Sequence, residues 1–311
     1  MAGLIALGNS SIWVSPQTTR TLLAHRGLAQ TYPATGLTAT TCTAARIFPP
    51  EHSFIENTLP SMRAAFAAGA DIVELDVHPT TDGQFAVFHD WTLDCRTDGH
   101  GVTRERSLAE LKKLDVGHGY TADGGKTFPF RGKGAGLMPS LDEVLAAFPD
   151  RRFLIHIKSN DPHEGEQLAS QLATLPSAQR VHLIVYGGNL PVERFRQHLP
   201  DMLTMSRAGL TQCLLRYIAI GWSGYVPAAC DHSLVLVPVN LAPWLWNWAN
   251  GFLNRMARAG STVVVVGPYS SGEFSRGIDS EAEFARLPHG FAGGIWTNRI
   301  DRVGALVRPR H

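Results

Sequence analysis

The sequence lacks a long apolar run, a C-x-x-C pair and an excess of charge of either sign. No segment reaches the roughly 18 consecutive apolar residues of a membrane-spanning helix, so none is predicted. The 311 residues carry a net charge of +1, with 28 basic and 27 acidic side chains interspersed. Because no basic field is available to hold a nucleic-acid backbone, we expect no nucleic-acid partner.

Cysteine is scarce and allows two interpretations. The absence of a C-x-x-C pair argues against a zinc or redox motif. Cys42 lies in a Thr-rich loop and Cys95 just after His89 and Asp90, so a disulfide between them would hold two long loops at one end of the molecule. The alternative is four free thiols, at Cys42, Cys95, Cys213 and Cys230.

The start of the chain is weakly apolar. Residues 1–16 have neither the basic start nor the small-residue cleavage site of a signal peptide. We interpret residues 1–20 as an N-terminal extension, the remnant of a longer anchor, and residues 21–311 as a single domain. This interpretation predicts an extracytoplasmic location, periplasmic or membrane-anchored, and predicts nothing about the oligomeric state.

From residue 21 onward, short aliphatic runs alternate with longer helical patterns, which is typical of repeated βα units around parallel strands. Strands are predicted at residues 21–25, 71–78, 152–158, 180–186, 202–206, 234–239, 262–266 and 293–297. Helices are predicted at residues 59–68, 141–148, 164–173, 192–198, 212–220, 244–259, 280–286 and 299–307. The predicted fold class is α/β, a single TIM-type barrel with a long insertion after the second strand.

Two segments depart from this alternation. Residues 84–137 form a long excursion, which in a barrel would overhang the C-terminal mouth, where active sites are built. The tryptophan-rich residues 241–252 predict either an outer helix that packs on the barrel or a surface that contacts a membrane.

The predicted strand at residues 71–78 carries the most informative pattern. Strand alternation places Glu74, Asp76 and His78 on one face and aliphatic side chains on the other. Two ionised carboxylates inside a barrel repel each other unless a cation lies between them, and such ligands suit Mg²⁺ or Ca²⁺ better than zinc. The alternative is an edge strand with a solvated polar face.

Two histidines lie at strand exits, where a barrel presents catalytic groups. His25 ends the first predicted strand, and His89 follows the apolar residues 85–88. Each alone is more often an ordinary hydrogen-bonded histidine, although histidine can donate and accept protons near neutral pH. Their combination with the paired carboxylates makes them candidates for catalysis.

Five short motifs together resemble the glycerophosphodiester phosphodiesterase domain in identity, order and spacing. They are His25-Arg26-Gly27, Glu56-Asn57-Thr58, Glu74-Leu75-Asp76-Val77, Thr81-Asp82-Gly83 and Val87-Phe88-His89-Asp90. The resemblance covers the first half of the chain closely and the second half only as a barrel outline. It implies a phosphoric diester hydrolase that releases an alcohol and glycerol phosphate from a glycerophosphodiester.

Carried over residue by residue, the resemblance implies a set of roles. A divalent cation, Ca²⁺ or Mg²⁺, would be bound by Glu74 and Asp76. Proton transfer would fall to His25 and His89, and the phosphate charge would be neutralised by Arg26 and Lys158. The supporting residues would be Glu56, Asn57 and Asp90.

The sequence departs from the family pattern in three places. His156 stands where the family carries a third acidic ligand, and because imidazole favours softer ions than Ca²⁺, this third ligand leaves the metal identity open. Asp161 is a weaker candidate for the missing carboxylate. Asn298 stands where the family often has aspartate, and the insertion at residues 28–52 is longer than usual.

Two alternatives to this function remain. A lysophospholipase D-like or phospholipase-like phosphodiesterase on the same barrel is favoured if the tryptophan-rich stretch and the loops form an apolar mouth. A non-catalytic barrel that binds a phosphorylated ligand is motivated by His156. The expected partners are accordingly a small phosphodiester or a lysophospholipid, with a membrane surface as a further contact.

Overall fold

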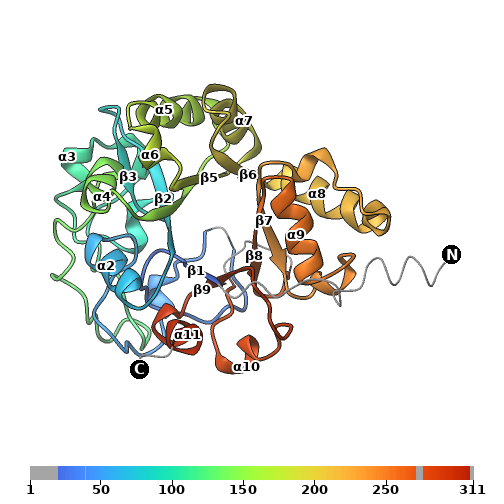
Figure 1. Cartoon of the computed structure of the whole chain (residues 1–311). Helices are drawn as coiled ribbons and strands as arrows, with labels where there is room; N and C mark the ends of the chain where they lie inside the picture. Colours follow the sequence, from blue (N-terminus) through green and yellow to red (C-terminus); the bar gives the residue numbers. More distant parts are fainter. Residues whose placement is uncertain (1–19, 39, 271–275, 309–311) are drawn as a thin grey trace.

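The computed structural model describes residues 20–38, 40–270 and 276–308, so nearly all of the predicted N-terminal extension lies outside the described residues (Figure 1). Parallel strands follow one another around a nearly closed barrel in the order β6-β5-β4-β2-β1-β9-β8-β7. A single parallel bridge, between Thr204 and Ser233, links the β6 and β7 edges. The predicted α/β fold, a TIM-type barrel, is confirmed.

All eight predicted strands are present with small shifts at their ends. They are β1 (Thr21–Ala24), β2 (Ile72–Pro79), β4 (Arg152–Ile157), β5 (Leu183–Gly187), β6 (Leu203–Ser206), β7 (Leu234–Pro238), β8 (Thr262–Val266) and β9 (Gly294–Thr297).

Helices surround the strands, as Figure 1 shows. They are α2 (Leu59–Ala67), α4 (Leu141–Ala147), α5 (Pro162–Ala173), α6 (Ser177–Arg180), α7 (Asn189–His198), α8 (Arg207–Ile220), α9 (Asn250–Arg258), α10 (Glu281–Phe284) and α11 (Ile300–Val307). No helix among the described residues is long and apolar enough to cross a membrane.

The predicted helix at residues 244–259 is wrong in its first part. The chain forms a short 3₁₀ helix, η7 (Ala242–Trp244), and α9 begins only at Asn250. Asn247 between them has a φ of 63°, which is left-handed, and the indole Nε1 of Trp246 donates to the carbonyl of Ile218 in α8. The bond from Trp246 to α8 and the left-handed backbone at Asn247 keep residues 245–249 from forming a helix.

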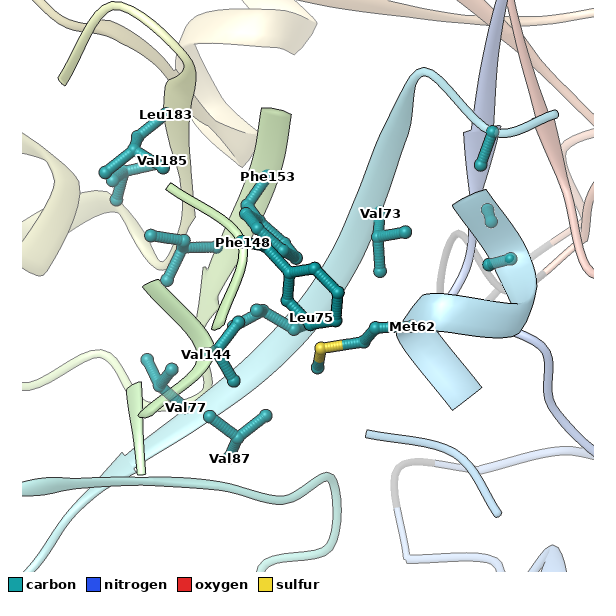
Figure 2. Close-up of a cluster of buried hydrophobic side chains, with 14 of the residues drawn as sticks. Met62, Val73, Leu75, Val77, Val87, Val144, Phe148, Phe153, Leu183 and Val185 are labelled. Carbon is teal, nitrogen blue, oxygen red and sulfur yellow. The ribbon is translucent and has the colours of Figure 1, made fainter. Parts of the chain in front are cut away.

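The outer face of the barrel packs against the helices. Figure 2 shows the side chains of β2 that alternate outward beside residues from α2, the α4 region and β4: Val73, Leu75, Val77, Met62, Val144, Phe148 and Phe153. Full burial of each aliphatic side chain stabilises the fold by roughly 1.5–3 kcal/mol. Since alternate residues of a strand point to opposite faces, this packing directs Glu74 and Asp76 into the barrel.

The excursion at residues 84–137 has its own small core. It contains β3 (Phe85–Val87), which pairs antiparallel with β2, the 3₁₀ helices η3 (Leu93–Cys95) and η4 (Thr103–Glu105), and α3 (Leu108–Leu111). Buried side chains beneath it include Phe88, Leu111, Tyr120 and Phe130. The excursion is therefore a packed layer on the second strand.

Two disulfides are present, so the interpretation as four free thiols is wrong. Cys42–Cys95 joins the insertion at residues 28–52 to the excursion, as the disulfide interpretation predicts. Cys213–Cys230, which the sequence analysis does not predict, joins α8 to the 3₁₀ helix η6 (Ala228–Cys230).

Candidate active site

The register of neighbouring strands brings three side chains together inside the barrel. Asp76 of β2 pairs with His156 of β4, which pairs in turn with Tyr186 of β5. His156 Nδ1 lies 2.9 Å from Asp76 Oδ1, and the rings of His156 and Tyr186 stack with their centroids 4.2 Å apart. The Tyr186 hydroxyl donates to Glu74 Oε1 over 2.6 Å. One cross-strand row thus links both carboxylates to His156.

Asp76 is buried among cationic and amide groups. Lys158 Nζ lies 3.5 Å from Oδ1, Arg26 Nε lies 3.3 Å from Oδ2, and Asn57 Nδ2 donates to Oδ2 over 3.1 Å. Burial opposes ionisation, but Lys158 and the other cations outweigh it and hold the pKa of Asp76 well below its usual range. Asp76 is therefore a permanent anion.

The pKa of Glu74 is shifted in the opposite direction from that of Asp76. Burial, and next the charge of Asp76, raise the pKa of Glu74 to about 8. With protein groups alone around it, Glu74 holds a proton at neutral pH, and a dication would displace that proton. Ligand atoms of Glu74, Asp76 and His156 all lie within 4.8 Å of one another. Two carboxylates and an imidazole at this spacing fit a divalent cation.

His25 is held in one tautomer by a relay from the last strand. Its Nδ1 lies 2.6 Å from Asn298 Oδ1. The Asn298 amide Nδ2 donates to Asp279 Oδ2 over 2.9 Å, so Oδ1 is the amide atom that faces His25 and can only accept. The proton of neutral His25 is therefore on Nδ1, and Nε2 keeps its lone pair. Burial, and next the charge of Arg26, lower the pKa of His25 to about 3.

His89 is oriented by a carboxylate. Its Nδ1 lies 2.6 Å from Asp90 Oδ1, and Asp90 Oδ2 lies 2.9 Å from Nε of the buried Arg96. Burial, then Arg26 and Lys158, lower the pKa of His89 well below its usual range. The two histidines thus have different partners, a neutral amide for one and an anion for the other.

Arg26 occupies a strained turn that its neighbours allow. Its φ is 58°, and Gly27 follows with a φ of 81°, where a side-chain Cβ would lie 2.2 Å from Ser61 Oγ. Glu56 Oε1 accepts from Arg26 Nη1 over 3.0 Å, and Glu56 Oε2 lies 3.2 Å from Arg96 Nη1. Glu56 therefore anchors both arginines.

Two cavities meet at His25 and Arg26. One, of about 380 Å³, is also lined by Asp76, His89, His156, Lys158, Tyr186 and Arg207. The other, of about 410 Å³, is lined largely by the insertion at residues 28–52, including Tyr32, Leu37 and Phe48. If a phosphodiester binds with its phosphate beside Arg26, each of its two ester substituents can occupy one of these cavities.

The structure brings together the ten residues singled out in the sequence analysis. They are His25, Arg26, Glu56, Asn57, Glu74, Asp76, His89, Asp90, His156 and Lys158. Asp161 does not join them, because it caps the N-terminus of α5 and pairs with Arg104. His78 lies nearby, but its Nε2 contacts the His89 carbonyl over 3.4 Å rather than the carboxylates.

Sequence reasoning misses three residues of this network: Arg96, Tyr186 and Asp279. Tyr186 was within reach, since strand alternation and the parallel register place it beside His156. Arg96 and Asp279 act through partners distant in the sequence, and no local pattern marks them.

Residues 25–189, more than half of the chain, match the model of the glycerophosphoryl diester phosphodiesterase family. The chain is 39% identical over 104 residues to a glycerophosphodiester phosphodiesterase of Caldanaerobacter subterraneus subsp. tengcongensis, covering 33% of this chain and 39% of that protein. It is 37% identical over 123 residues to one of Bacillus subtilis, covering 38% and 41%. The chain thus spans about two fifths of the length of these curated relatives.

The fold resembles solved structures over nearly the whole chain. The glycerophosphodiester phosphodiesterase from Agrobacterium tumefaciens has a TM-score of 0.60 at 20% identity, covering 94% of this chain and 100% of that one. An Oleispira antarctica phosphodiesterase in complex with the product sn-glycerol-3-phosphate has a TM-score of 0.58 at 18% identity, covering 93% and 98%. With the family model matched across its first barrel strands and both histidine motifs, the chain belongs to the glycerophosphoryl diester phosphodiesterase family.

Proposed function

We propose that the chain hydrolyses glycerophosphodiesters to an alcohol and glycerol phosphate, and that it binds Ca²⁺ or Mg²⁺ through Glu74, Asp76 and His156. One observation carries the proposal: two members of this ligand group, two cationic side chains and two oriented histidines line one cavity of about 380 Å³. When bound there, a divalent cation would polarise the phosphoryl oxygens and offset the charge that develops on them.

Arg26 and Lys158 bind the phosphate in this proposal. Both already lie against Asp76, at 3.3 and 3.5 Å, so their positions are fixed before substrate arrives. Preorganised cations of this kind stabilise the charge that grows on phosphoryl oxygens in the transition state.

His25 is the proton acceptor. Its Nδ1 proton is held by Asn298, so Nε2 can take a proton from the attacking hydroxyl, which belongs to water or to the substrate's own glycerol. The bond to Asn298 favours the protonated ring, but burial and the charge of Arg26 outweigh it, so the pKa of His25 is about 3 and the ring is neutral.

His89 is the proton donor, through Nε2, to the departing alkoxide. Asp90 at its Nδ1 stabilises the protonated ring, as a carboxylate does in a catalytic triad. In the protein alone, burial and then the cations Arg26 and Lys158 lower the pKa of His89. An anionic phosphodiester bound beside them would offset this effect and raise the pKa of His89.

A lysophospholipid is the second candidate substrate. The cavity of about 410 Å³ beside His25 is lined by Leu37, Phe48 and Tyr32, which could contact an apolar chain. The non-catalytic alternative finds less support, because each residue expected to move a proton retains a partner that orients it.

We also propose that the chain works outside the cytoplasm. Two disulfides among the described residues support an oxidising compartment. Thiol labelling of protein isolated without reductant should give no signal until the protein is unfolded and reduced, and ready labelling before reduction would contradict this location.

The enzymatic proposal is tested by incubating purified protein with glycerophosphocholine and with a lysophospholipid, with added Ca²⁺ or Mg²⁺ and with chelator. Glycerol phosphate release should require the cation. His25→Ala and His89→Ala should each abolish release, while His163→Ala, which removes an exposed histidine of α5, should leave it unchanged. No turnover of either substrate with any divalent cation would refute the enzymatic function.

A further inference from the structure

A ridge of exposed apolar side chains lies on the outer side of the barrel. It is formed by two segments: the outer part of α8 with the 3₁₀ helix η5 (Gly221–Ser223) and the residues just after it, and η7 with the residues just after it. Its side chains are Leu215, Ile220, Trp222, Tyr225, Trp244 and Trp246. Three of these are more than half exposed, Leu215 at 62%, Tyr225 at 58% and Trp244 at 68%. Single exposed aromatics are ordinary, but three tryptophans and a tyrosine on two adjacent segments indicate an interaction surface.

The two segments of the ridge are fixed to each other. Trp246 Nε1 donates to the carbonyl of Ile218 over 2.8 Å, and the Tyr217 hydroxyl donates to the carbonyl of Trp246 over 3.0 Å. Arg255 Nη1 of α9 donates to the Gly221 carbonyl over 2.8 Å. With the Cys213–Cys230 disulfide at the middle of α8, these bonds make the ridge one preorganised surface.

The charge around the ridge is mainly positive. Residues 202–260 contain one acidic residue, the exposed Asp231, but they carry four arginines: Arg207, Arg216, Arg255 and Arg258. Arg216 and Arg258 are exposed, and Arg258 lies one helical turn beyond Arg255 on the same side of α9. The whole chain has a net charge of only +1, so this excess of basic over acidic side chains is a local feature of the segments that form the ridge.

One helix, α8, carries part of the ridge at one end and lines the candidate active site at the other. α8 begins at Arg207, which lines the cavity that holds Asp76, His89 and Lys158. Its 14 residues span about 21 Å, and Figure 1 shows α8 beside α9 on the outer side of the β6 and β7 edges. The ridge residues of α8 therefore lie about 12 to 20 Å along the helix from the cavity, toward the opposite end of α8.

We propose that this ridge docks the protein on an anionic phospholipid bilayer. Tryptophan and tyrosine prefer the boundary between headgroups and acyl chains, where an apolar ring and a polar N–H or O–H are both accommodated. Arginines beside them are attracted to an anionic leaflet, and in residues 202–260 the four arginines outnumber the single acidic residue, Asp231. The ridge is short and fixed, so it would lie in the interface rather than cross the bilayer.

Vesicle co-sedimentation of the full chain tests the proposal without relying on catalysis. Binding should be strong to vesicles of phosphatidylcholine mixed with phosphatidylglycerol, weak to phosphatidylcholine alone, and reduced by added salt. The triple variant Trp222→Ser/Tyr225→Ser/Trp244→Ser should bind about tenfold or more weakly. Val181→Ser removes an apolar side chain that is 73% exposed outside the ridge and should bind normally.

A second pair of variants tests the charge. Arg216→Glu/Arg258→Glu should weaken binding to the mixed vesicles by about tenfold or more. Lys113→Glu/Lys126→Glu makes the same change in net charge on the excursion and should have little effect. Circular dichroism of every variant should match the parent.

Three outcomes would each overturn the proposal: the parent fails to bind the mixed vesicles, the ridge variants bind as well as the parent does, or binding does not depend on anionic lipid. So would a dimer that both ridge variants dissociate, since a second copy would then cover the ridge.

Discussion

At the scale of single residues, His156 is the departure from the family pattern that lies within the ligand group. Its Nδ1 lies 2.9 Å from Asp76 Oδ1, and its ring stacks on Tyr186, so it is held beside both carboxylates. An imidazole at this position adds no negative charge to the ligand group, whereas a carboxylate would. The choice of cation should therefore depend on this one side chain.

The variant His156→Glu should favour Ca²⁺. We expect its affinity for Ca²⁺ relative to Mg²⁺ to rise about tenfold, because a third carboxylate adds charge and a hard oxygen ligand. Isothermal titration with each cation measures this ratio directly. His163→Glu, which places the same residue on the exposed side of α5, is the matched control. An unchanged ratio in His156→Glu would show that position 156 is not a ligand.

Asn298 is a positioning residue in our interpretation, because it acts through His25. Asn298→Leu keeps the volume but removes the acceptor from His25 Nδ1, so both the tautomer and the ring orientation are released. We expect kcat to fall about 100-fold with KM nearly unchanged. Asn298→Asp should restore much of the loss by supplying another acceptor. A rise in KM and a loss of stability without a fall in kcat would point to a purely structural role.

At the scale of the element, the strands were predictable because each is a short, continuous aliphatic run whose neighbours are helical. The site residues carried by local motifs, such as His25 beside Gly27, were predictable for the same reason. The start of α9 was not, because Trp246 is held by a bond to Ile218 in another element. The relay from Asp279 through Asn298 to His25 was also hidden, since 273 residues separate its last two members.

The two disulfides offer a matched comparison between elements. Cys42–Cys95 closes a sequence separation of 53 residues and Cys213–Cys230 one of 17. In the chain-entropy model, the longer loop stabilises the fold by about 4 kcal/mol and the shorter by about 3 kcal/mol. We expect Cys42→Ala/Cys95→Ala to lower the free energy of unfolding by about 1 kcal/mol more than Cys213→Ala/Cys230→Ala does.

Urea denaturation of the two double variants, with the parent as reference, measures this difference. If the shorter loop has the larger effect, chain entropy is not the main contribution of these bonds. The docking proposal adds a second expectation, since loss of Cys213–Cys230 should weaken vesicle binding and loss of Cys42–Cys95 should not.

At the scale of the whole molecule, the ligand group links metal binding to the stability of the barrel. Glu74, Asp76 and His156 come from two adjacent strands, so a cation that binds them binds only the folded chain. Without a cation, burial and Asp76 raise the pKa of Glu74 from 4.5 to about 8. Between these values the folded chain holds a proton that the unfolded chain does not, so this group lowers stability as pH rises through that window.

A divalent cation should reverse this pH trend. At about 100 times its dissociation constant, a bound ion stabilises the folded chain by about 2.7 kcal/mol. Because the proton on Glu74 must leave first, the gain in Tm on adding Ca²⁺ or Mg²⁺ should be larger near about pH 8.5 than near about pH 6. Thermal unfolding with cation and with chelator, at matched ionic strength, measures both gains. Glu74→Gln cannot ionise, so its gain should be smaller and should depend less on pH than the gain of the parent. A gain that changes with pH as much as in the parent would assign the proton to another group.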